Sequence, residues 1–377
     1  MWSSKGAKRR EWHSSYLQVH PGIQRRGAVF SVLDQLWNLE FNPHEPSHTD
    51  PAWAQDLPVF PFITLLPSSI PGDGVVSFLD TTAFAGDLAR TIEPPAPNLA
   101  AVTDFVRRYQ DAAIAWVSAA LDAGVVTSAM VQRAVSDFTV GYAFSSSELR
   151  AVDGLATSQQ RAATDALAQR FLALPGLEAW QERPRVAYVQ HCPAEATRQT
   201  SSNSLPLIDD YSWWVSSQIP LPVWIAYDPV DPQVFGFEDS APSDVPIEST
   251  CEVFGDDAGD VRIKHPKAAL REDLRVFEVS GIDDVVRLVE RYPARLVESD
   301  CTRLFPEWAG HDAPIEYVLD WVRLAKDYDG VRLSVPAALE VAYVPVRVNT
   351  PGGGTAMFTG WTPGSTVYLR DPRTTKR

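Results

Sequence analysis

Cysteine is scarce in this chain, with three among 377 residues. Cys192, Cys251 and Cys301 are far apart and odd in number, and the sequence contains no C-x-x-C pair. A small secreted domain held by disulfides carries an even set of cysteines at short spacings. The cysteines therefore argue against a disulfide framework, and we expect the protein in the reducing cytoplasm.

Long apolar runs are also missing. Two uncharged stretches, residues 57–72 and 211–227, are interrupted by prolines. Both fall short of the roughly 20 apolar residues that a membrane helix needs. The first residues lack the apolar run and small-residue cleavage site of a secretory leader. We expect a soluble protein with no membrane partner.

Positive charge is in deficit, with 33 Lys and Arg against 48 Asp and Glu, a net charge of −15. Residues 1–27 are the exception, because six basic residues and one Glu give +5 there and leave −20 for the remainder. A nucleic-acid surface needs clustered Lys and Arg, so nucleic acid is an expected partner only of residues 1–27. We interpret residues 1–27 as a basic, disordered arm outside the fold.

One metal-binding pattern occurs. Residues 44–48 read His-Glu-x-x-His, the zinc metalloprotease pattern, whose two histidines must share one face of a helix. Pro43, Pro46 and Pro51 surround and interrupt that stretch, and proline breaks a helix interior. An irregular site that adds Asp50 has no further support. We predict a proline-rich loop, no metal and no cofactor.

The spacing of apolar residues predicts an α+β protein with a mainly helical N-terminal half. The clearest helix is expected at 98–124, with apolar residues every three or four positions. Further helices are expected at 128–139 and 158–173. The C-terminal part is predicted to be a mixed α/β region ending in an antiparallel meander. The predicted domains are residues 1–27 (arm), 28–180 (helix-rich) and 185–377 (α+β).

Within residues 185–377 the pattern predicts individual elements. Strands are expected at 185–190, 222–228, 274–279 and 294–299, and a helix is expected from Ser280 to Pro293. A helix is predicted from residue 315 to 326, and a long strand is predicted over 339–348. "PGGG" at 351–354 is predicted to be a hairpin loop, and the segments on either side of "TPGS" are predicted to pair with each other.

An aromatic cluster is the preferred binding region. Tyr211, Trp213, Trp214 and Trp224 lie within 17 residues, beside a polar loop at 198–204. Aromatic rings can line a pocket or a partner surface, and they also fill cores. The binding interpretation requires some of these rings to be exposed.

Arg332 and Ser334 are the weaker candidates, for catalysis. They lie two apart on a predicted strand and hence on one face, where an Arg and a Ser can hold a phosphate or a carboxylate. ADP-ribosyltransferases use Arg, Ser and Glu around nicotinamide dinucleotide, and Glu278 or Glu340 would supply the carboxylate here. The alternative is a solvated sheet face opposite buried Val, Leu and Val, and we expect the polar residues beyond position 270 to lie at the surface.

The C-terminal region resembles a family of uncharacterised actinobacterial proteins. The resemblance is carried by "FEDS" (237–240), "RVFEVSGIDDVVRLVERYP" (275–293), "DYDGVRLS" (327–334) and "GWTPGSTVYL" (360–369). The family pattern has His and Thr where this chain has Arg332 and Ser334, and a glycine segment where it has residues 335–341. The resemblance implies no known activity and supports only the extent of the C-terminal domain.

The sequence thus predicts a soluble, acidic, cytoplasmic protein that binds an unidentified protein or small molecule. The alternative is an NAD-dependent ADP-ribosyltransferase-like enzyme with a site in the C-terminal sheet. Which of the two holds depends on whether Arg332 and Ser334 open onto a cleft with a glutamate within reach.

Overall fold

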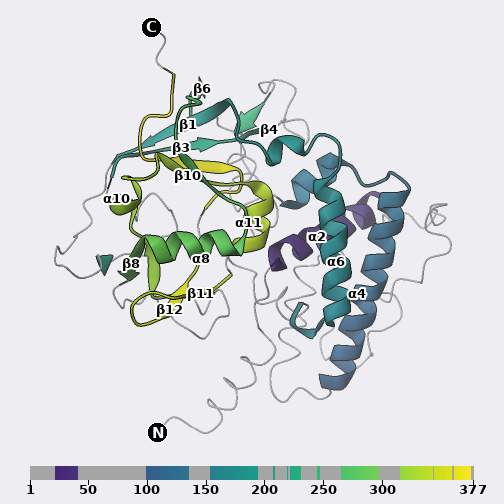
Figure 1. Ribbon diagram of the computed structural model, residues 1–377. Coiled ribbons are helices and arrows are strands. Elements are labelled where there is room, and N and C mark those ends of the chain that lie inside the picture. Colours follow the sequence, from purple (N-terminus) through teal and green to yellow (C-terminus); the bar gives the residue numbers. More distant parts are fainter. Residues whose placement is uncertain are drawn as a thin grey trace, which may run out of the picture. The chain divides into compact units, whose positions relative to one another are not determined.

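Figure 1 shows the computed structural model of the chain. It describes residues 22–40, 99–135, 153–193, 207–208, 219, 221–230, 244–246, 265–296, 315–342, 344–358 and 361–374. The chain divides into two compact units. The first, here called the helical unit, comprises Met1–Phe138 and Phe144–Pro175. The second, here called the sheet unit, comprises Thr139–Ala143 and Gly176–Arg377. Helices in the first and mixed sheets in the second confirm the predicted α+β class.

Among the described residues of the helical unit are three long helices: α2 (Ile23–Glu40), α4 (Leu99–Asp122) and α6 (Ser158–Leu172). Each of the three packs against the other two, and in Figure 1 α4 and α6 run side by side while α2 crosses them. Val106, Tyr109, Ala113 and Trp116 of α4 are buried, as their three- and four-residue spacing predicted. Shorter helical stretches lie at residues 128–135 and 153–155.

The ends of α4 and α6 follow from local sequence. Gly124, with φ of 71°, lies just past α4, where a left-handed residue without a Cβ ends a helix at least cost. Thr157 and Gln160 form a capping box at the start of α6, in which each side chain bonds the other residue's amide.

Helix α2 corrects the predicted arm. It begins at Ile23, and Arg26 within it is 2% exposed. Residues 23–27 are therefore part of the folded helical unit. Carboxylates from elsewhere in that unit pair with Arg25 and Arg26, which allows these charged side chains to be buried. Residues 1–21 lie outside the described residues.

The sheet unit holds a six-stranded sheet with the order β6-β1-β3-β13-β10-β7. Its strands are β1 (Val186–Cys192), β3 (Val223–Tyr227), β6 (Lys267–Ala269), β7 (Val276–Val279), β10 (Gly330–Leu333) and β13 (Ser365–Tyr368). Strands β7 and β10 run parallel, and the other four pairings are antiparallel.

A second sheet of five strands has the order β11-β12-β9-β8-β2. Its strands are β2 (Leu207–Ile208), β8 (Pro293–Leu296), β9 (Tyr317–Leu319), β11 (Val346–Val348) and β12 (Gly354–Ala356). A two-stranded ribbon joins β4 (Pro229–Val230) to β5 (Val245–Pro246). Helix α8 (Ile282–Arg291) packs against β8, β9 and β11, on the side nearer the six-stranded sheet in Figure 1. The described residues of this unit also include the short helices η2 (Glu178–Trp180), α10 (Trp321–Leu324) and α11 (Val335–Val341).

Two predicted elements are wrong in type. The helix predicted at 315–326 is strand β9 followed by the single turn α10, which begins where the Asp320 carboxylate accepts from the Arg323 amide. The strand predicted at 339–348 is divided between α11 and β11. Ser334 caps α11 and Pro336 lies in its first turn, two start signals that outweigh the β-branched composition downstream.

The predicted C-terminal meander is correct in one half. Strands β11 and β12 form the hairpin around the glycine segment, with Val348 opposite Gly354. Strand β13 does not pair with β12; it enters the six-stranded sheet between β3 and β10. The turn before β13 thus connects the two sheets.

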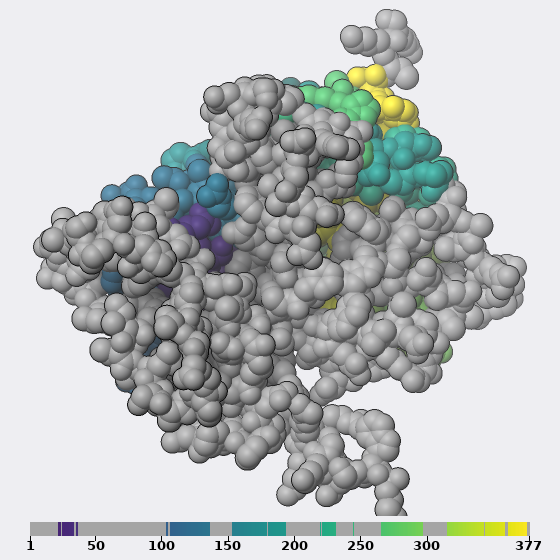
Figure 2. Space-filling view, turned by 180° about the vertical axis from the view of Figure 1, so that it is seen from behind, coloured from purple at the N-terminus to yellow at the C-terminus, as the bar shows by residue number. Residues whose placement is uncertain are grey.

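The end of the described chain is tied to the segment that contains β6. Leu270 and Arg373 form an antiparallel bridge, and the Thr374 amide donates to the Ala269 carbonyl at 3.0 Å. Figure 2 shows the surface of these C-terminal residues (yellow) next to that of the residues near 270 (green). Among the described residues, no helix is both long enough and apolar enough to cross a bilayer.

Candidate functional site

A row of polar side chains crosses the six-stranded sheet at the end where β7 and β10 finish. Register places Glu278 beside Arg332 and Arg332 beside Thr366. Residues opposite one another in neighbouring strands project from the same face. Tyr368 lies two residues beyond Thr366 and shares this face, whereas Val331 lies on the apolar opposite face.

Arg332 is the centre of the row, and its side chain is 1% exposed. Nη2 donates to Oδ2 of Asp228 at 3.0 Å and to the backbone carbonyl of Glu182 at 2.7 Å. Nη1 donates to Oε2 of Glu278 at 3.4 Å. The expectation that this face is solvated is therefore wrong for Arg332, because two carboxylates and a carbonyl replace the water that a buried guanidinium needs.

Asp228 follows the last residue of β3, and its side chain is 7% exposed. Its amide donates to the Gly364 carbonyl at 3.0 Å, which fixes the carboxylate beside the start of β13. Burial raises the pKa of Asp228 to about 7, against the attraction of Arg332 and with the repulsion of Glu278. The carboxyl therefore exchanges its proton near neutral pH.

Three buried polar atoms of this row have no hydrogen-bond partner in the part of the chain that the structure describes. They are Oδ1 of Asp228, Nε of Arg332 and the hydroxyl of Tyr368. Burial raises the pKa of Tyr368 to about 12, although Arg183, the Thr366 side chain and Arg332 act to lower it; Glu278 adds to the rise. We call Asp228, Glu278, Arg332 and Tyr368 the Arg332 cluster. Glu278 gives it contact with solvent, because its side chain is 42% exposed.

The other two catalytic candidates, Ser334 and Glu340, lie beside helix ends. The Ser334 hydroxyl accepts from the Ala337 amide at 3.3 Å and so caps α11. The Glu340 carboxylate lies against the start of α8, where a Cβ on Gly281 would be 3.1 Å from Oε1. Both residues are near the carboxyl ends of β7 and β10, but the contacts described for Arg332 involve neither.

Of the four residues in the predicted aromatic site, the structure describes only Trp224. Trp224 in β3 is partly buried, and its ring lies 4.9 Å from that of His191 on β1. Trp224 also packs on the core cluster that contains Leu270, Leu274 and Tyr368. Tyr211, Trp213 and Trp214 lie outside the described residues, as does the His-Glu-x-x-His stretch. Among the described residues, no group of three or more His, Cys, Asp or Glu side chains is arranged to hold a metal.

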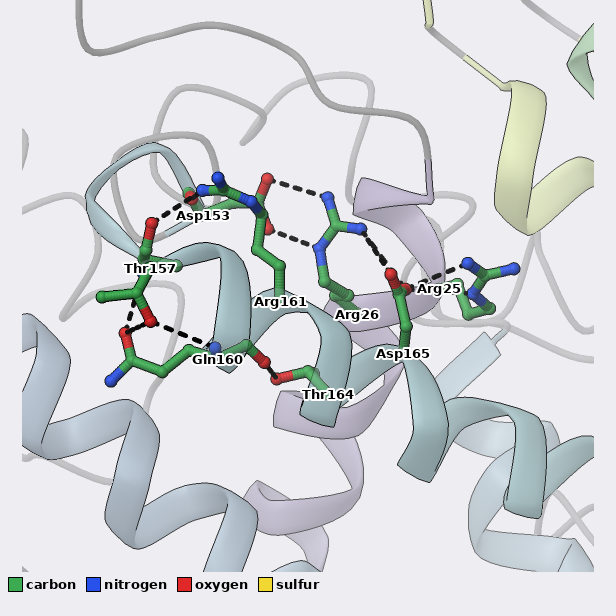
Figure 3. Close-up of polar contacts among 9 residues, drawn as sticks. Arg25, Arg26, Asp153, Thr157, Gln160, Arg161, Thr164 and Asp165 are labelled. Atoms are coloured by element: carbon green, nitrogen blue, oxygen red, sulfur yellow. Dashed lines mark hydrogen bonds and ion pairs between the residues drawn. The ribbon is translucent and has the colours of Figure 1, made fainter.

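A second buried ionic cluster lies in the helical unit (Figure 3). Arg26 of α2 reaches Asp153 with Nε at 2.5 Å and with Nη2 at 2.9 Å, and both side chains are 3% exposed. Nη1 of Arg26 also lies 3.3 Å from Asp165 of α6, to which Arg25 donates as well. These ion pairs join three separate segments of the helical unit, which is a structural role.

Two members of the Arg332 cluster, Asp228 and Tyr368, did not emerge from the sequence. Asp228 stands between a strand and Pro229, and Tyr368 reads as one more aromatic residue of a β-strand. Only the pairing of β10 with β13, and of β13 with β3, brings them to Arg332. No protein-family model, no curated protein and no solved structure matches this chain. The resemblance to the actinobacterial family stays a prediction.

Proposed function

We propose that this protein acts by binding a small polar molecule at the Arg332 cluster. The observation that carries the proposal is the presence of three buried polar atoms without partners in one group of ionisable side chains. Native proteins leave few such atoms, because each costs about 1–3 kcal/mol. A bound molecule that bonds these atoms recovers that free energy, which would give the site affinity.

The contacts of Arg332 favour binding over transferase chemistry. A transferase of the predicted kind needs the fork of its arginine for the dinucleotide. Here both Nη atoms bond protein oxygens, and the Ser334 hydroxyl caps a helix. An enzyme using the predicted set would have to break these bonds before it bound substrate.

Tyr368 and Tyr227 offer a matched pair for the test. Both are buried in the six-stranded sheet, but the Tyr227 hydroxyl donates to Gln190 at 3.0 Å, while the Tyr368 hydroxyl makes no comparable hydrogen bond to a described residue. In the absence of any added compound, Tyr368→Phe is expected to leave stability unchanged or higher. Tyr227→Phe is expected to lower it by about 1 kcal/mol. Urea unfolding measures both.

The binding experiment then screens small amines, acids, sugars and nucleotides by thermal shift, since a ligand of the folded state raises its melting temperature. We expect at least one compound to stabilise the natural sequence and the Tyr227→Phe variant, and to stabilise Tyr368→Phe less. If no compound stabilises the natural sequence, or if Tyr368→Phe unfolds as readily as Tyr227→Phe, the proposal fails.

A further inference from the structure

We infer that residues 371–374, here called the strap, protect one edge of the six-stranded sheet from pairing with a second copy of this chain. The inference is independent of the proposed function. It follows from the backbone bonds between the strap and the β6 segment, from the residues of the strap itself and from those of the strand that it covers.

The strap lies along the side of the β6 segment that faces away from β1. The amide of Leu270 donates to the residue that precedes β1, and successive backbone groups of a strand point to alternate sides. On the other side, the Arg271 amide donates to the Pro372 carbonyl at 2.8 Å, and the Ala269 carbonyl accepts from the Thr374 amide at 3.0 Å. These two bonds make the strap an additional antiparallel strand outside β6.

The outer side of the strap is poorly suited to a further strand. Pro372 has no amide hydrogen to donate. Arg373 is opposite Leu270 between the two bonds, so its own amide points away from β6, where it donates to Oδ1 of Asp371 at 3.0 Å. The side chains of Asp371 and Arg373 form an ion pair and are 43% and 45% exposed. Proline, exposed charge and a satisfied outward amide are features with which natural proteins prevent edge-to-edge pairing.

The strand beneath the strap lacks these features. Residues 268–270 are Ala, Ala and Leu, with neither charge nor proline. Without the strap, the Ala269 carbonyl and the Arg271 amide both lose their partners and face outward. Unpaired backbone groups on the edge of a sheet are the template on which another strand pairs.

This edge is complementary to itself, which identifies the partner as a second copy. The edge offers one acceptor at Ala269 and one donor at Arg271, two residues apart. In an antiparallel pair centred on Leu270, the Arg271 amide of each copy donates to the Ala269 carbonyl of the other. Both bonds that the strap supplies are then replaced, and the twofold contact uses the same edge of both copies.

The test compares the full chain with a shortened chain that ends at Arg370, so that the ion pair of Arg370 with Asp329 is kept. Molar mass is measured by light scattering over a range of protein concentrations. We expect the shortened chain to reach about twice the molar mass of the natural sequence as its concentration rises, because a twofold contact closes at two copies.

A substitution on the edge provides the control. Ala269 is exposed, so Ala269→Lys in the shortened chain places a charge on the edge and should restore the molar mass of the natural sequence. If the shortened chain keeps the natural molar mass at every concentration and its circular dichroism shows that it is folded, the inference is overturned. An increase that Ala269→Lys leaves unchanged also overturns it, because the copies then associate elsewhere.

Two proline variants of the full chain decide the question if the shortened chain does not fold. Thr374→Pro removes the amide that bonds β6, whereas Arg373→Pro removes an amide that bonds only within the strap. We expect the molar mass to rise with concentration for Thr374→Pro and to stay at the natural value for Arg373→Pro. Equal molar masses for the two variants would then overturn the inference.

Discussion

Replacing Arg26 with methionine should destabilise the helical unit far more than the same change at Arg25. The Arg26 side chain and its partner Asp153 are each 3% exposed, and two nitrogens of Arg26 bond both oxygens of that carboxylate. Methionine fills similar space without charge, so Asp153 is left buried and ionised. Breaking a buried pair in this way costs about 3–5 kcal/mol.

Arg25 is the matched control, because it lies on the same helix and also bonds Asp165 (Figure 3). Its pair is partly solvated, with side-chain exposures of 16% for Arg25 and 28% for Asp165. The Arg25→Met variant is expected to lose at most about 1 kcal/mol. The difference between the two variants should therefore be about 2–4 kcal/mol.

Amide hydrogen exchange in α2 and α6 is the appropriate assay, since it reports the opening of these helices separately from the sheet unit. Adding Asp153→Asn to Arg26→Met should recover part of the loss, because it removes the unpaired charge while keeping the size of the side chain. Equal amide protection in the Arg25 and Arg26 variants would refute the idea that the Arg26–Asp153 ion pair is the main ionic contact of this unit. So would a double variant that regains no protection.

Three further predictions concern the sheet unit and are measured by urea unfolding. Ser334→Ala removes the cap of α11 and should lower the free energy of unfolding by about 1 kcal/mol. Ser334→Asp can still cap the helix and should lower it less. Equal losses of stability in the two variants would contradict the capping role. Gly330→Ala should be destabilising by roughly 1–3 kcal/mol, because its Cβ would lie 2.8 Å from the Val367 carbonyl oxygen; a neutral result would show that β10 and β13 separate easily. The pKa of Asp228 is raised to about 7 from 3.8, so the folded state binds this proton more tightly than the unfolded state. Its contribution to the free energy of unfolding is complete below about pH 4 and is lost as pH rises through 7. The stability of the natural sequence relative to Asp228→Asn should therefore fall between pH 5 and pH 8, and a rise would contradict the burial of this carboxyl.

Local sequence predicted those elements whose signals are complete within a few residues. Helix α4 shows apolar residues at helical spacing and a glycine at its end, and both are where they were expected. The hairpin of β11 and β12 could be predicted from the glycine segment that connects its two strands. Residues 339–341 show the limit of such reasoning. The β-branched composition of 339–348 suggested a strand, but Ser334 and Pro336 begin a helix that extends to Val341.

By itself, the sequence determined the α+β class, the helix of the α4 region and the presence of Arg332 on a strand with an apolar opposite face. Only the tertiary structure decided that the face of β10 that carries Arg332 is covered as well. Leu270 and Leu274 pack over that face, and Glu182, 150 residues from Arg332, supplies a carbonyl to it. The physical reason is that alternation along a strand distinguishes two faces, whereas burial depends on segments that are distant in the chain. Pairing between distant strands also brings Asp228, Arg332 and Tyr368, which are far apart in the sequence, into one group of buried polar side chains.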